Sequence, residues 1–365
     1  MRDAAVITIT LILVFLLLGY TYNLVSPYLI KLGVIEKSDK RAVLAPDGGI
    51  FRSEDFGRTW AQANKTTDGG ELEKSDVFEI KFSPKDARMI YAATAKGLFV
   101  SQDSANTWRN ILDAKIVFSD EAIVAFALDQ KNPQRMYLAA FEVNKRSRIL
   151  KTKGVGFYEV YSTAAAENKI TGLWVDSFDP SVIYAGTTQG LLLVSRDFGE
   201  SWGIVHEFTG PVGELEMLPS DTRVILVAAG GSIFKSPNQG NTFKQIWQEG
   251  GIGATSTLIN DLSIDPHDET VIYAATSRGL FRSSDSGLSF TQLKFPIAAE
   301  AANVATVYAA REKKNLLLLG INSDIYKSED AGVSWQIQQL NSSRKVSVVK
   351  IKPGDPQTIF AGVKQ

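Results

Sequence analysis

The stretch SEDFGRTW at residues 53–60 decides the fold of this chain, because the chain repeats it. Its pattern, S-x-D-x-G-x-[ST]-[WF], recurs in full at residues 195–202, 283–290 and 328–335, and with one exchange at 101–108 and 236–243. An eroded copy occupies residues 152–158. The seven segments begin 41–51 residues apart. Such a period indicates a repeat protein with one structural unit for each segment.

The sequence around each octapeptide, which we call the box, repeats as well. Ahead of a box come an alternating stretch such as VFEIKF at 77–82, a loop rich in Asp and Pro, and an apolar run with a turn such as MIYAATAKGLFVS at 89–101. This arrangement predicts four short strands in each repeat. Four-stranded units with this period are typical of propeller blades. The sequence therefore predicts an all-β, seven-bladed β-propeller over residues 42–365.

The residues of the box suit a tight turn. Its Asp can accept hydrogen bonds from amides of its own turn, and its Gly supplies a positive φ. The closing aromatic residue begins an outer strand and packs between blades. Each box offers one carboxylate, too few for calcium, so we expect no metal there. The residues with this structural role are Asp55, Gly57, Trp60, Asp103, Trp108, Asp197, Gly199, Trp202, Asn238, Gly240, Phe243, Asp285, Gly287, Phe290, Asp330, Gly332 and Trp335.

The two ends of the propeller complement each other. Residues 42–63 contain a box with third and fourth strands, whereas residues 345–352 form a lone first strand. Pairing the two ends would close the ring and remove its exposed edges. Residues 43–45 and 359–361 both resemble a second strand. Either one of them is displaced, or the chain continues beyond Gln365.

The N-terminus differs in composition from the rest of the chain. Residues 4–19 are uncharged and almost wholly apolar, which is typical of a membrane-spanning helix. We predict one N-terminal transmembrane helix at residues 1–28, followed by a linker at 29–41. A cleaved signal peptide is the alternative, but a small-residue cleavage site is hard to find.

The orientation of this anchor has two interpretations. Lys31, Lys37, Lys40 and Arg41 follow the apolar segment, and the positive-inside rule then favours a cytoplasmic propeller. Short N-terminal anchors ahead of one large domain usually export that domain. We therefore expect a single-pass membrane protein with an extracytoplasmic propeller.

The repeats resemble those of Asp-box, or BNR, propellers. The string DP-x(4)-[IV]YA[AG]T-x-x-GL-x-x-S before a box is most similar to the photosystem II stability/assembly factor-like group. Sialidases, sortilin-type receptors and xyloglucan-degrading glycosidases share the box. The resemblance implies boxes between the third and fourth strands of each blade, but no single activity. The F-R-I-P segment of sialidases is missing, since box residue Ser53 follows Phe51 and Arg52 directly.

Composition excludes several functions. The net charge of −1 gives no basic face for nucleic acid. Cysteine is absent, and the two histidines, His206 and His267, lie far apart in the sequence, which argues against thiol catalysis and histidine metal sites. No hydrolase, phosphate-binding or metalloprotease motif occurs. We therefore assign no catalytic residue, cofactor or metal, and favour a protein that is not an enzyme.

Four acidic residues enter first strands on the face that carries the strand 4–1 and strand 2–3 loops. They could form a ring around the channel mouth and bind a ligand, although a solvated rim is the simpler interpretation. If two of them faced each other across a cleft, they would suit glycoside hydrolysis. The four are Asp76, Glu121, Glu214 and Asp261.

The third repeat has a longer hairpin on the same face, with Lys145, Arg146 and Arg148 at its tip. Binding residues often lie on loops of a rigid scaffold, although charge can also serve only to keep a surface hairpin soluble. From these features we expect a membrane-anchored, non-enzymatic scaffold that binds a protein partner and aids assembly or stability of a membrane complex. The alternative is a carbohydrate-active propeller, either a glycoside hydrolase or a glycan-binding module.

Overall fold

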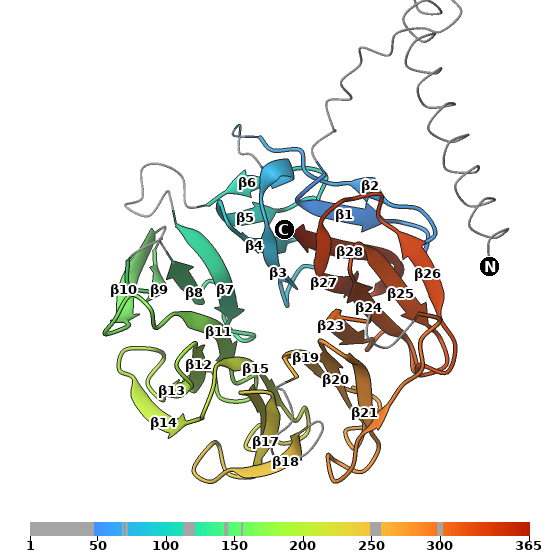
Figure 1. The fold of residues 1–365 in the computed structure, drawn as a ribbon. Coiled ribbons are helices and arrows are strands. Elements are labelled where there is room, and N and C mark those ends of the chain that lie inside the picture. The colour runs from blue at the N-terminus through green and yellow to red at the C-terminus, as the bar shows by residue number, and fades with distance from the viewer. Residues whose placement is uncertain are drawn as a thin grey trace, which may run out of the picture. The chain divides into compact units, whose positions relative to one another are not determined.

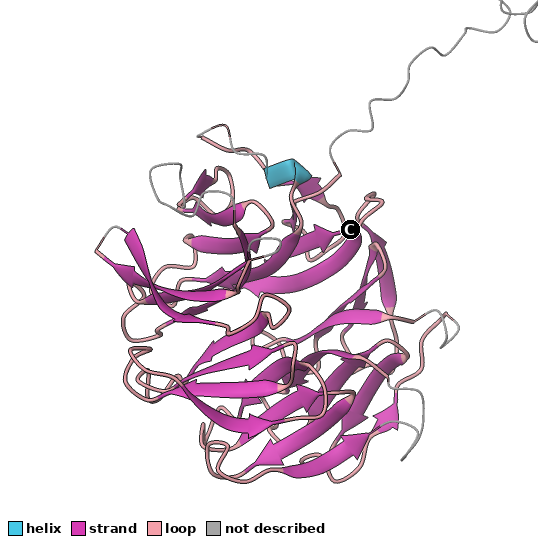
Figure 2. Cartoon of the chain, turned by 60° about the vertical axis from the view of Figure 1, so that its left-hand side comes forward, coloured by secondary structure: helices cyan, strands magenta, loops and turns pink. Residues whose placement is uncertain are grey.

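A computed structural model describes residues 47–67, 69, 72–111, 121–141, 145–154, 156–248, 257–297 and 302–365. The expected anchor at 1–28, the linker at 29–41 and residues 43–45 lie outside this part. Among the described residues no helix has the length and apolarity that a membrane crossing requires. The regular secondary structure of the described residues consists of strands and one short 3-10 helix, η1 (Leu72–Lys74) (Figure 2).

Seven four-stranded antiparallel sheets form a ring around a central channel (Figure 1). The predicted all-β, seven-bladed propeller is thereby confirmed. From the channel outwards, the first three sheets consist of β3 (Val77–Phe82), β4 (Ile90–Thr94), β5 (Gly97–Ser101) and β6 (Arg109–Asn110); β7 (Ala122–Leu128), β8 (Met136–Phe141), β9 (Arg148–Lys153) and β10 (Gly156–Ser162); and β11 (Ile170–Val175), β12 (Ile183–Thr187), β13 (Leu191–Ser195) and β14 (Gly203–Glu207). The next three consist of β15 (Val212–Met217), β16 (Ile225–Ala229), β17 (Ser232–Ser236) and β18 (Lys244–Gln248); β19 (Ile259–Ile264), β20 (Ile272–Thr276), β21 (Gly279–Ser283) and β22 (Thr291–Gln292); and β23 (Val304–Ala309), β24 (Leu317–Ile321), β25 (Asp324–Ser328) and β26 (Gln336–Gln339). The seventh sheet consists of β27 (Lys345–Lys352), β28 (Asp355–Lys364), β1 (Ile50–Ser53) and β2 (Ala61–Gln62).

The closing sheet joins the two ends of the propeller. Its first two strands, β27 and β28, come from the C-terminal end, and its outer strands, β1 and β2, come from the N-terminal end. Phe51 lies opposite Ala361 and Ser53 opposite Ile359 in the β1–β28 ladder. Residues 359–361 therefore supply the second strand, the position for which the sequence offered two candidates.

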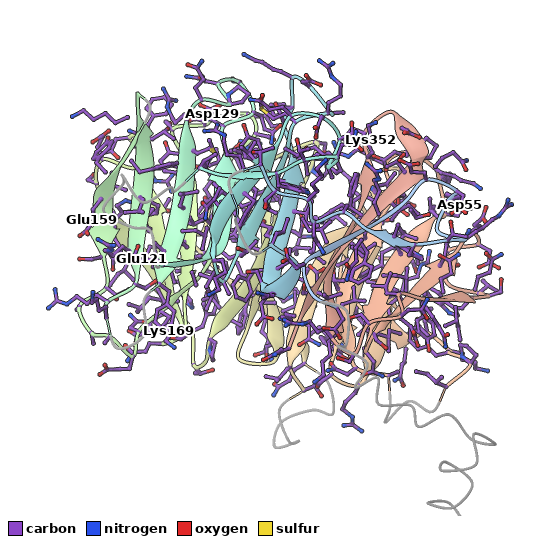
Figure 3. The ribbon with its side chains drawn as sticks, turned by 90° about the horizontal axis from the view of Figure 1, so that it is seen from above. Asp55, Glu121, Asp129, Glu159, Lys169 and Lys352 are labelled. Carbon is purple, nitrogen blue, oxygen red and sulfur yellow. The ribbon has the colours of Figure 1, made fainter. Side chains whose placement is uncertain are left out.

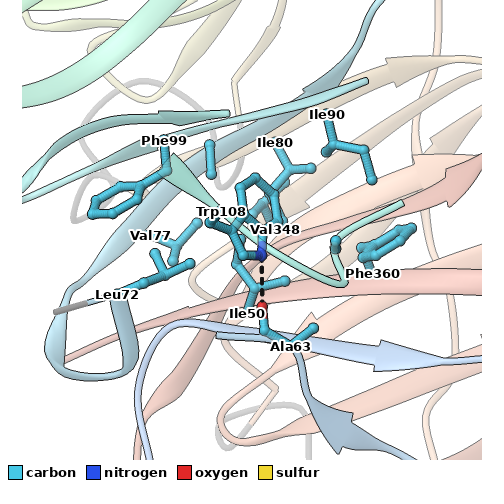
Figure 4. Close-up of a cluster of buried hydrophobic side chains, with 12 residues drawn as sticks. Ile50, Ala63, Leu72, Val77, Ile80, Ile90, Phe99, Trp108, Val348 and Phe360 are labelled. Atoms are coloured by element: carbon cyan, nitrogen blue, oxygen red, sulfur yellow. Dashed lines mark hydrogen bonds between the residues drawn. The ribbon is translucent and has the colours of Figure 1, made fainter. Parts of the chain in front are cut away.

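The core lies between neighbouring sheets. One cluster brings Ile50 and Phe360 of the closing sheet against Ile80 and Phe99 of the next sheet (Figure 4). The box residue Trp108 is buried among them, and its indole Nε1 donates a hydrogen bond to the Ala63 carbonyl oxygen at 2.7 Å. Each such large side chain removed from water contributes about 1.5–3 kcal/mol. Packing between blades is therefore the main force that holds the ring together.

The box turns make a repeated set of hydrogen bonds. In the first box, Ser53 Oγ accepts from the Gly57 amide at 2.8 Å, and Asp55 Oδ1 accepts from the Thr59 amide at 2.8 Å. Asp55 Oδ2 accepts from the Thr59 hydroxyl at 2.7 Å. The amide and the hydroxyl of Thr59 are the main reasons why the pKa of Asp55 is lowered to about 2. The carboxylate is thus held in its charged form by its own turn.

Two successive residues of each box have positive φ, where the sequence predicted one. Phe56 has φ 61° ahead of Gly57 at 85°, and Ser104 has φ 60° ahead of Ala105 at 66°. Each non-glycine residue in this region costs about 1–2 kcal/mol. Ala105 keeps the turn although it replaces the glycine of the pattern. The serine-to-amide hydrogen bond, 2.8 Å from the Ala105 nitrogen to Ser101 Oγ, is also kept.

The first of these two residues connects its blade to the preceding blade. Its carbonyl oxygen accepts a hydrogen bond from the neighbouring sheet in at least five boxes. The donors and acceptors are Arg52 Nη1 to Ser104 at 2.8 Å, the Tyr137 hydroxyl to Phe198 at 2.8 Å, the Tyr184 hydroxyl to Gln239 at 3.2 Å, Lys235 Nζ to Ser286 at 3.2 Å, and Lys327 Nζ to Phe56 at 3.2 Å. The strained turn therefore also holds neighbouring blades together.

The sheet β7–β10 departs from this pattern. A short hairpin between β9 and β10, with Gly154 at φ 61°, stands where the other sheets have a box. Lys151 and the Tyr158 hydroxyl, the latter at 2.9 Å, instead bind Glu200 in the box of the next sheet. The eroded repeat thus adds two contacts to the following blade beside the Tyr137–Phe198 hydrogen bond.

Candidate functional site

The seven innermost strands share one irregularity. In β3 the register shifts between Val77 and Glu79, and in each of the other inner strands it shifts at the equivalent place. A bulge of this kind inserts one residue and redirects the side chains that follow it. Because the bulges coincide, residues of different blades can be compared position by position around the channel.

Three sets of equivalent positions follow from this register. Layer 1, the bulged residues, consists of Phe78, Val124, Thr171, Gly213, Asn260, Ala305 and Ser347. Layer 2, one residue further, consists of Glu79, Ala125, Gly172, Glu214, Asp261, Thr306 and Val348. Layer 3, two residues beyond layer 2, consists of Lys81, Ala127, Trp174, Glu216, Ser263, Tyr308 and Lys350. All except Ala127 line a cavity of about 990 Å³ that also reaches the strand 1–2 loops, such as those of Pro84, Arg311 and Pro353.

Layer 1 contributes to ring closure. The Thr171 and Ser347 hydroxyls donate to the carbonyl oxygens of Val212 and Val77, and Asn260 Nδ2 donates to the Val304 carbonyl oxygen at 2.8 Å. Each acceptor belongs to the residue just before the bulge of the next inner strand. Where a layer 1 residue has a side-chain hydrogen-bond donor, that side chain therefore links its inner strand to the next one.

Layer 2 carries three carboxylates with defined partners. Glu79 Oε2 accepts from the Phe126 amide at 2.9 Å, and Asp261 Oδ2 accepts from the equivalent Val307 amide at 2.9 Å. Asp261 Oδ2 also accepts from the Thr306 hydroxyl at 2.8 Å. Glu214 Oε1 accepts from Trp174 Nε1 at 2.7 Å. These carboxylates join neighbouring inner strands.

Three acids on two neighbouring strands have raised pKa values. Burial raises the pKa of Glu214 well above its usual range, and the charges of Asp261 and Glu216 raise it further. Burial and Asp261 raise the pKa of Glu216 to about 7, against the opposing charges of Lys350 and Lys81. Burial also raises the pKa of Asp261. All three side chains remain partly exposed to the channel, so water there screens part of this repulsion.

Positive charge lies on the opposite wall. Lys350 of β27 lies with its Nζ 5.1 Å from the centre of the Tyr308 ring. Lys81 of β3 is bound to Glu79 and to the Phe126 carbonyl oxygen. In the ring, β15 stands opposite β27 and β3 (Figure 1). The channel is thus acidic along β15 and β19 and basic along β27, whereas Glu79 and Lys81 balance each other on β3.

The expected ring of four acids at one mouth is not formed. Glu214 and Asp261 line the cavity, whereas Asp76 binds Arg344 Nη1 at 2.7 Å and the Gln365 amide at 3.0 Å. Glu121 forms an ion pair with Arg148. The reason is position: Asp76 and Glu121 precede their inner strands, while Glu214 and Asp261 follow the bulge.

The basic hairpin is smaller than expected. Lys145 and Arg146 are exposed, but Arg148 is the first residue of β9 and also lies 3.4 Å from Glu159. Its two partners, Glu121 and Glu159, lie on the same side of the molecule (Figure 3). Arg148 is therefore part of the sheet and not of the tip, because two carboxylates hold it against the blade.

A family model described as the BNR-Asp box repeat matches residues 50–63. The chain is a BNR/Asp-box repeat β-propeller. Comparison with curated protein sequences finds no match. Among the described residues, no group of three or more His, Asp or Glu side chains is placed to hold a metal ion.

Solved structures share the fold of this Asp-box propeller at low identity. The GH74 xyloglucanase from Xanthomonas campestris matches with a TM-score of 0.63 and 16% identity over 79% of this chain and 51% of that chain. The chain thus spans about half the length of the xyloglucanase. YCF48 from Cyanidioschyzon merolae matches with a TM-score of 0.60 and 13% identity over 79% and 95% of the two chains. YCF48 bound to D1 peptide matches with a TM-score of 0.56 and 14% identity over 80% and 93%.

Sequence reasoning missed the channel side chains of layer 3 in this Asp-box propeller. Glu216 lies two residues after Glu214 in an alternating stretch, so both belong on one side of a strand. That spacing could have identified it. Trp174, Tyr308 and Lys350 carried no comparable signal, because their shared layer depends on the bulge register of three different blades.

Proposed function

We propose that this protein is a non-enzymatic scaffold whose propeller binds a polypeptide partner and aids assembly or stability of a membrane complex. Residues 1–28 anchor it in the membrane, and the propeller faces the extracytoplasmic side. YCF48, a propeller of the same fold, has a structure bound to D1 peptide. That likeness supports a polypeptide ligand as a property that this fold accommodates.

The observation that carries the proposal is the channel cavity. Its volume is about 990 Å³, at the upper end of the usual range for ligand sites. Its walls carry both signs of charge together with Trp174 and Tyr308. Inner strands of all seven blades contribute to it, and this variety suits a ligand with several different side chains.

The channel carboxylates are poorly placed for glycoside hydrolysis. A glycosidase needs one carboxyl group to protonate the leaving oxygen and a second to attack or to activate water. Asp261 is occupied by the Thr306 hydroxyl and the Val307 amide, and Glu214 by Trp174. These bonds use Asp261 Oδ2 and Glu214 Oε1 to join neighbouring strands.

A carbohydrate-active propeller is the second candidate. Glu214 and Asp261 are neighbouring acids with raised pKa values beside an indole, and such groups can act as general acids. If this candidate is correct, purified residues 42–365 should bind or hydrolyse xyloglucan oligosaccharides. Glu214→Gln should then abolish turnover without unfolding the protein.

The decisive experiment is cross-linking of the full-length chain in intact membranes of its host. We expect one protein to co-purify in near-stoichiometric amount, and xyloglucan oligosaccharides should not displace it. A chain that lacks residues 1–36 controls for the anchor and should be released in soluble form. Oligosaccharide turnover without any stoichiometric protein partner would establish the second candidate instead.

A further inference from the structure

Two side chains of the channel wall have opposite charge when both are ionised, and Lys350 also lies against the Tyr308 ring. In the part of the chain that the structure describes, neither Glu216 nor Lys350 takes part in a hydrogen bond or an ion pair. Lys81 in the same layer differs, since it binds Glu79. Glu214 and Asp261 also differ, because both accept hydrogen bonds from the neighbouring blade or its side chains.

These two residues occupy the same layer on opposite sides of the ring. Glu216 belongs to β15 and Lys350 to β27. Their sheets are three places apart, the largest separation that a ring of seven allows. Both line the cavity. They therefore face each other across the channel instead of pairing, although the charge of Lys350 still acts on Glu216.

Folding alone does not require this arrangement. A charge that is partly removed from water is costly unless a partner compensates it. The layer tolerates a small apolar residue, since β7 has Ala127 at the equivalent position. A ligand that brings a positive group to Glu216 and a negative group to Lys350 would pair both. Arg311, at the strand 1–2 loop on the cavity wall, adds positive charge near Lys350's side of the ring.

We propose that the channel binds an extended segment of the partner polypeptide, with a basic side chain directed to Glu216 and an acidic side chain directed to Lys350. This rests on the proposed scaffold function and names what the scaffold recognises. In an extended chain successive side chains point in opposite directions. The basic and acidic residues of the segment therefore stand an odd number of positions apart.

The cavity favours a polypeptide over a small zwitterion. It extends from the bulges of the inner strands to the strand 1–2 loops of Arg311 and Pro353. A free amino acid would satisfy the two charges but leave most of this wall unused.

The test uses titration calorimetry of residues 42–365 with end-blocked hexapeptides. The first probe is acetyl-Gly-Gly-Lys-Asp-Gly-Gly-amide, the second separates Lys and Asp by one Gly, and the third replaces them by Gln and Asn. We expect the first probe to bind most tightly. Glu216→Gln and Lys350→Gln should each weaken it roughly tenfold, as expected when one charge loses its partner. The third probe should bind all variants equally weakly.

Matched controls lie on the outer strands. Glu207→Gln on β14 and Lys244→Gln on β18 remove the same charges from exposed positions and should leave affinity unchanged. The double variant Glu216→Lys/Lys350→Glu should regain binding, because the peptide can enter in the reverse direction. Circular dichroism and the Tm of each variant confirm that it is folded.

Four results would overturn the proposal. Equal affinity of the first and third probes would show that charge is not recognised. Unchanged binding by Glu216→Gln and Lys350→Gln would exclude these residues. Tighter binding of free lysine or aspartate than of the peptides would make the ligand a small zwitterion. If the channel variants still capture the membrane partner, the channel inference fails while the scaffold function stands.

Discussion

The box turns and the channel wall use the same repeat in opposite ways. At equivalent box positions the residues are nearly constant, and they satisfy one another, as Ser195, Asp197 and Ser201 do. At equivalent positions of layer 3 the residues change from blade to blade, from Lys81 to Trp174 to Glu216. Backbone geometry accounts for the first set. The second set is free to vary, and that freedom is where a repeat protein can acquire a specific ligand.

The largest effect is expected from a box aromatic. Trp108 is buried and hydrogen-bonded, whereas Trp335 at the equivalent position is only partly buried. Trp108→Ala should cost about 3–5 kcal/mol of unfolding free energy, as for other buried aromatic residues. Trp335→Ala should cost less. Urea unfolding measures both changes. Equal losses of unfolding free energy would show that packing between blades does not determine how much a box aromatic residue stabilises the protein.

The next largest effect is expected from the Asp of a box, and its pH dependence should distinguish the box turns from the channel wall. The hydroxyl and amide of Ser201 lower the pKa of Asp197 to about 2 from an unperturbed 3.8. A lowered pKa contributes stability above the unfolded value and loses it as the pH falls toward the folded value. Asp197→Asn should therefore lower Tm at pH 7, and its deficit should shrink between about pH 4 and pH 2.

Asn238→Asp is the matched control for this change. Asn238 uses one oxygen for both the amide of Thr242 at 2.9 Å and its hydroxyl at 3.2 Å. A carboxylate there should raise Tm at pH 7 and lose the gain over the same acid range. A deficit of Asp197→Asn that stayed constant with pH would contradict a charge-based role for the box Asp.

The channel should respond to pH with the opposite sign. Burial and the charge of Asp261 raise the pKa of Glu216 from 4.5 to about 7. The folded state then holds more protons than the unfolded state in this window, so Glu216 lowers stability as the pH rises from 4.5 to 7. Glu216→Gln should have the wild-type Tm at pH 4.5 and a higher Tm at pH 8.

Glu207→Gln tests whether loss of one negative charge is sufficient for this effect. Glu207 is exposed on β14, so its Tm difference from the wild type should not grow between pH 4.5 and pH 8. If both variants behaved alike, net charge and not the channel environment would explain the result. A Tm for Glu216→Gln below the wild-type value at pH 8 would show that the carboxylate is stabilising in the folded channel.

The smallest effect is expected at the hairpin of the β7–β10 sheet. Lys145 and Arg146 are exposed, so changing both to Ser should alter stability by less than about 0.5 kcal/mol. Partner capture should weaken modestly and only at low salt, because rim charges mainly affect the encounter rate. Arg148→Ser should behave differently and destabilise the sheet, since it removes the partner of buried Glu121. Loss of stability in the Lys145/Arg146 variant would show that these residues have a structural role.

The sequence by itself determined the repeat, the number of blades and the residues of the box turns. Those features depend on local chemistry, since Asp55 finds its partners within four residues of itself. The eroded box at 152–158 was also visible, and the structure has a plain hairpin there. The closing sheet was predictable in outline, but the choice of 359–361 as its second strand depends on pairing with β1, about 300 residues away.

Only the tertiary structure decided which side chains share the channel. The common bulge adds one residue to each inner strand, and this shifts the side chains after it. Asp76 and Glu121, which precede the strands, therefore take ion-pair partners elsewhere, while Glu216 and Lys350 face each other from strands more than 100 residues apart. A sequence pattern repeats every blade, but the opposition of two blades across a ring exists only after the ring has closed.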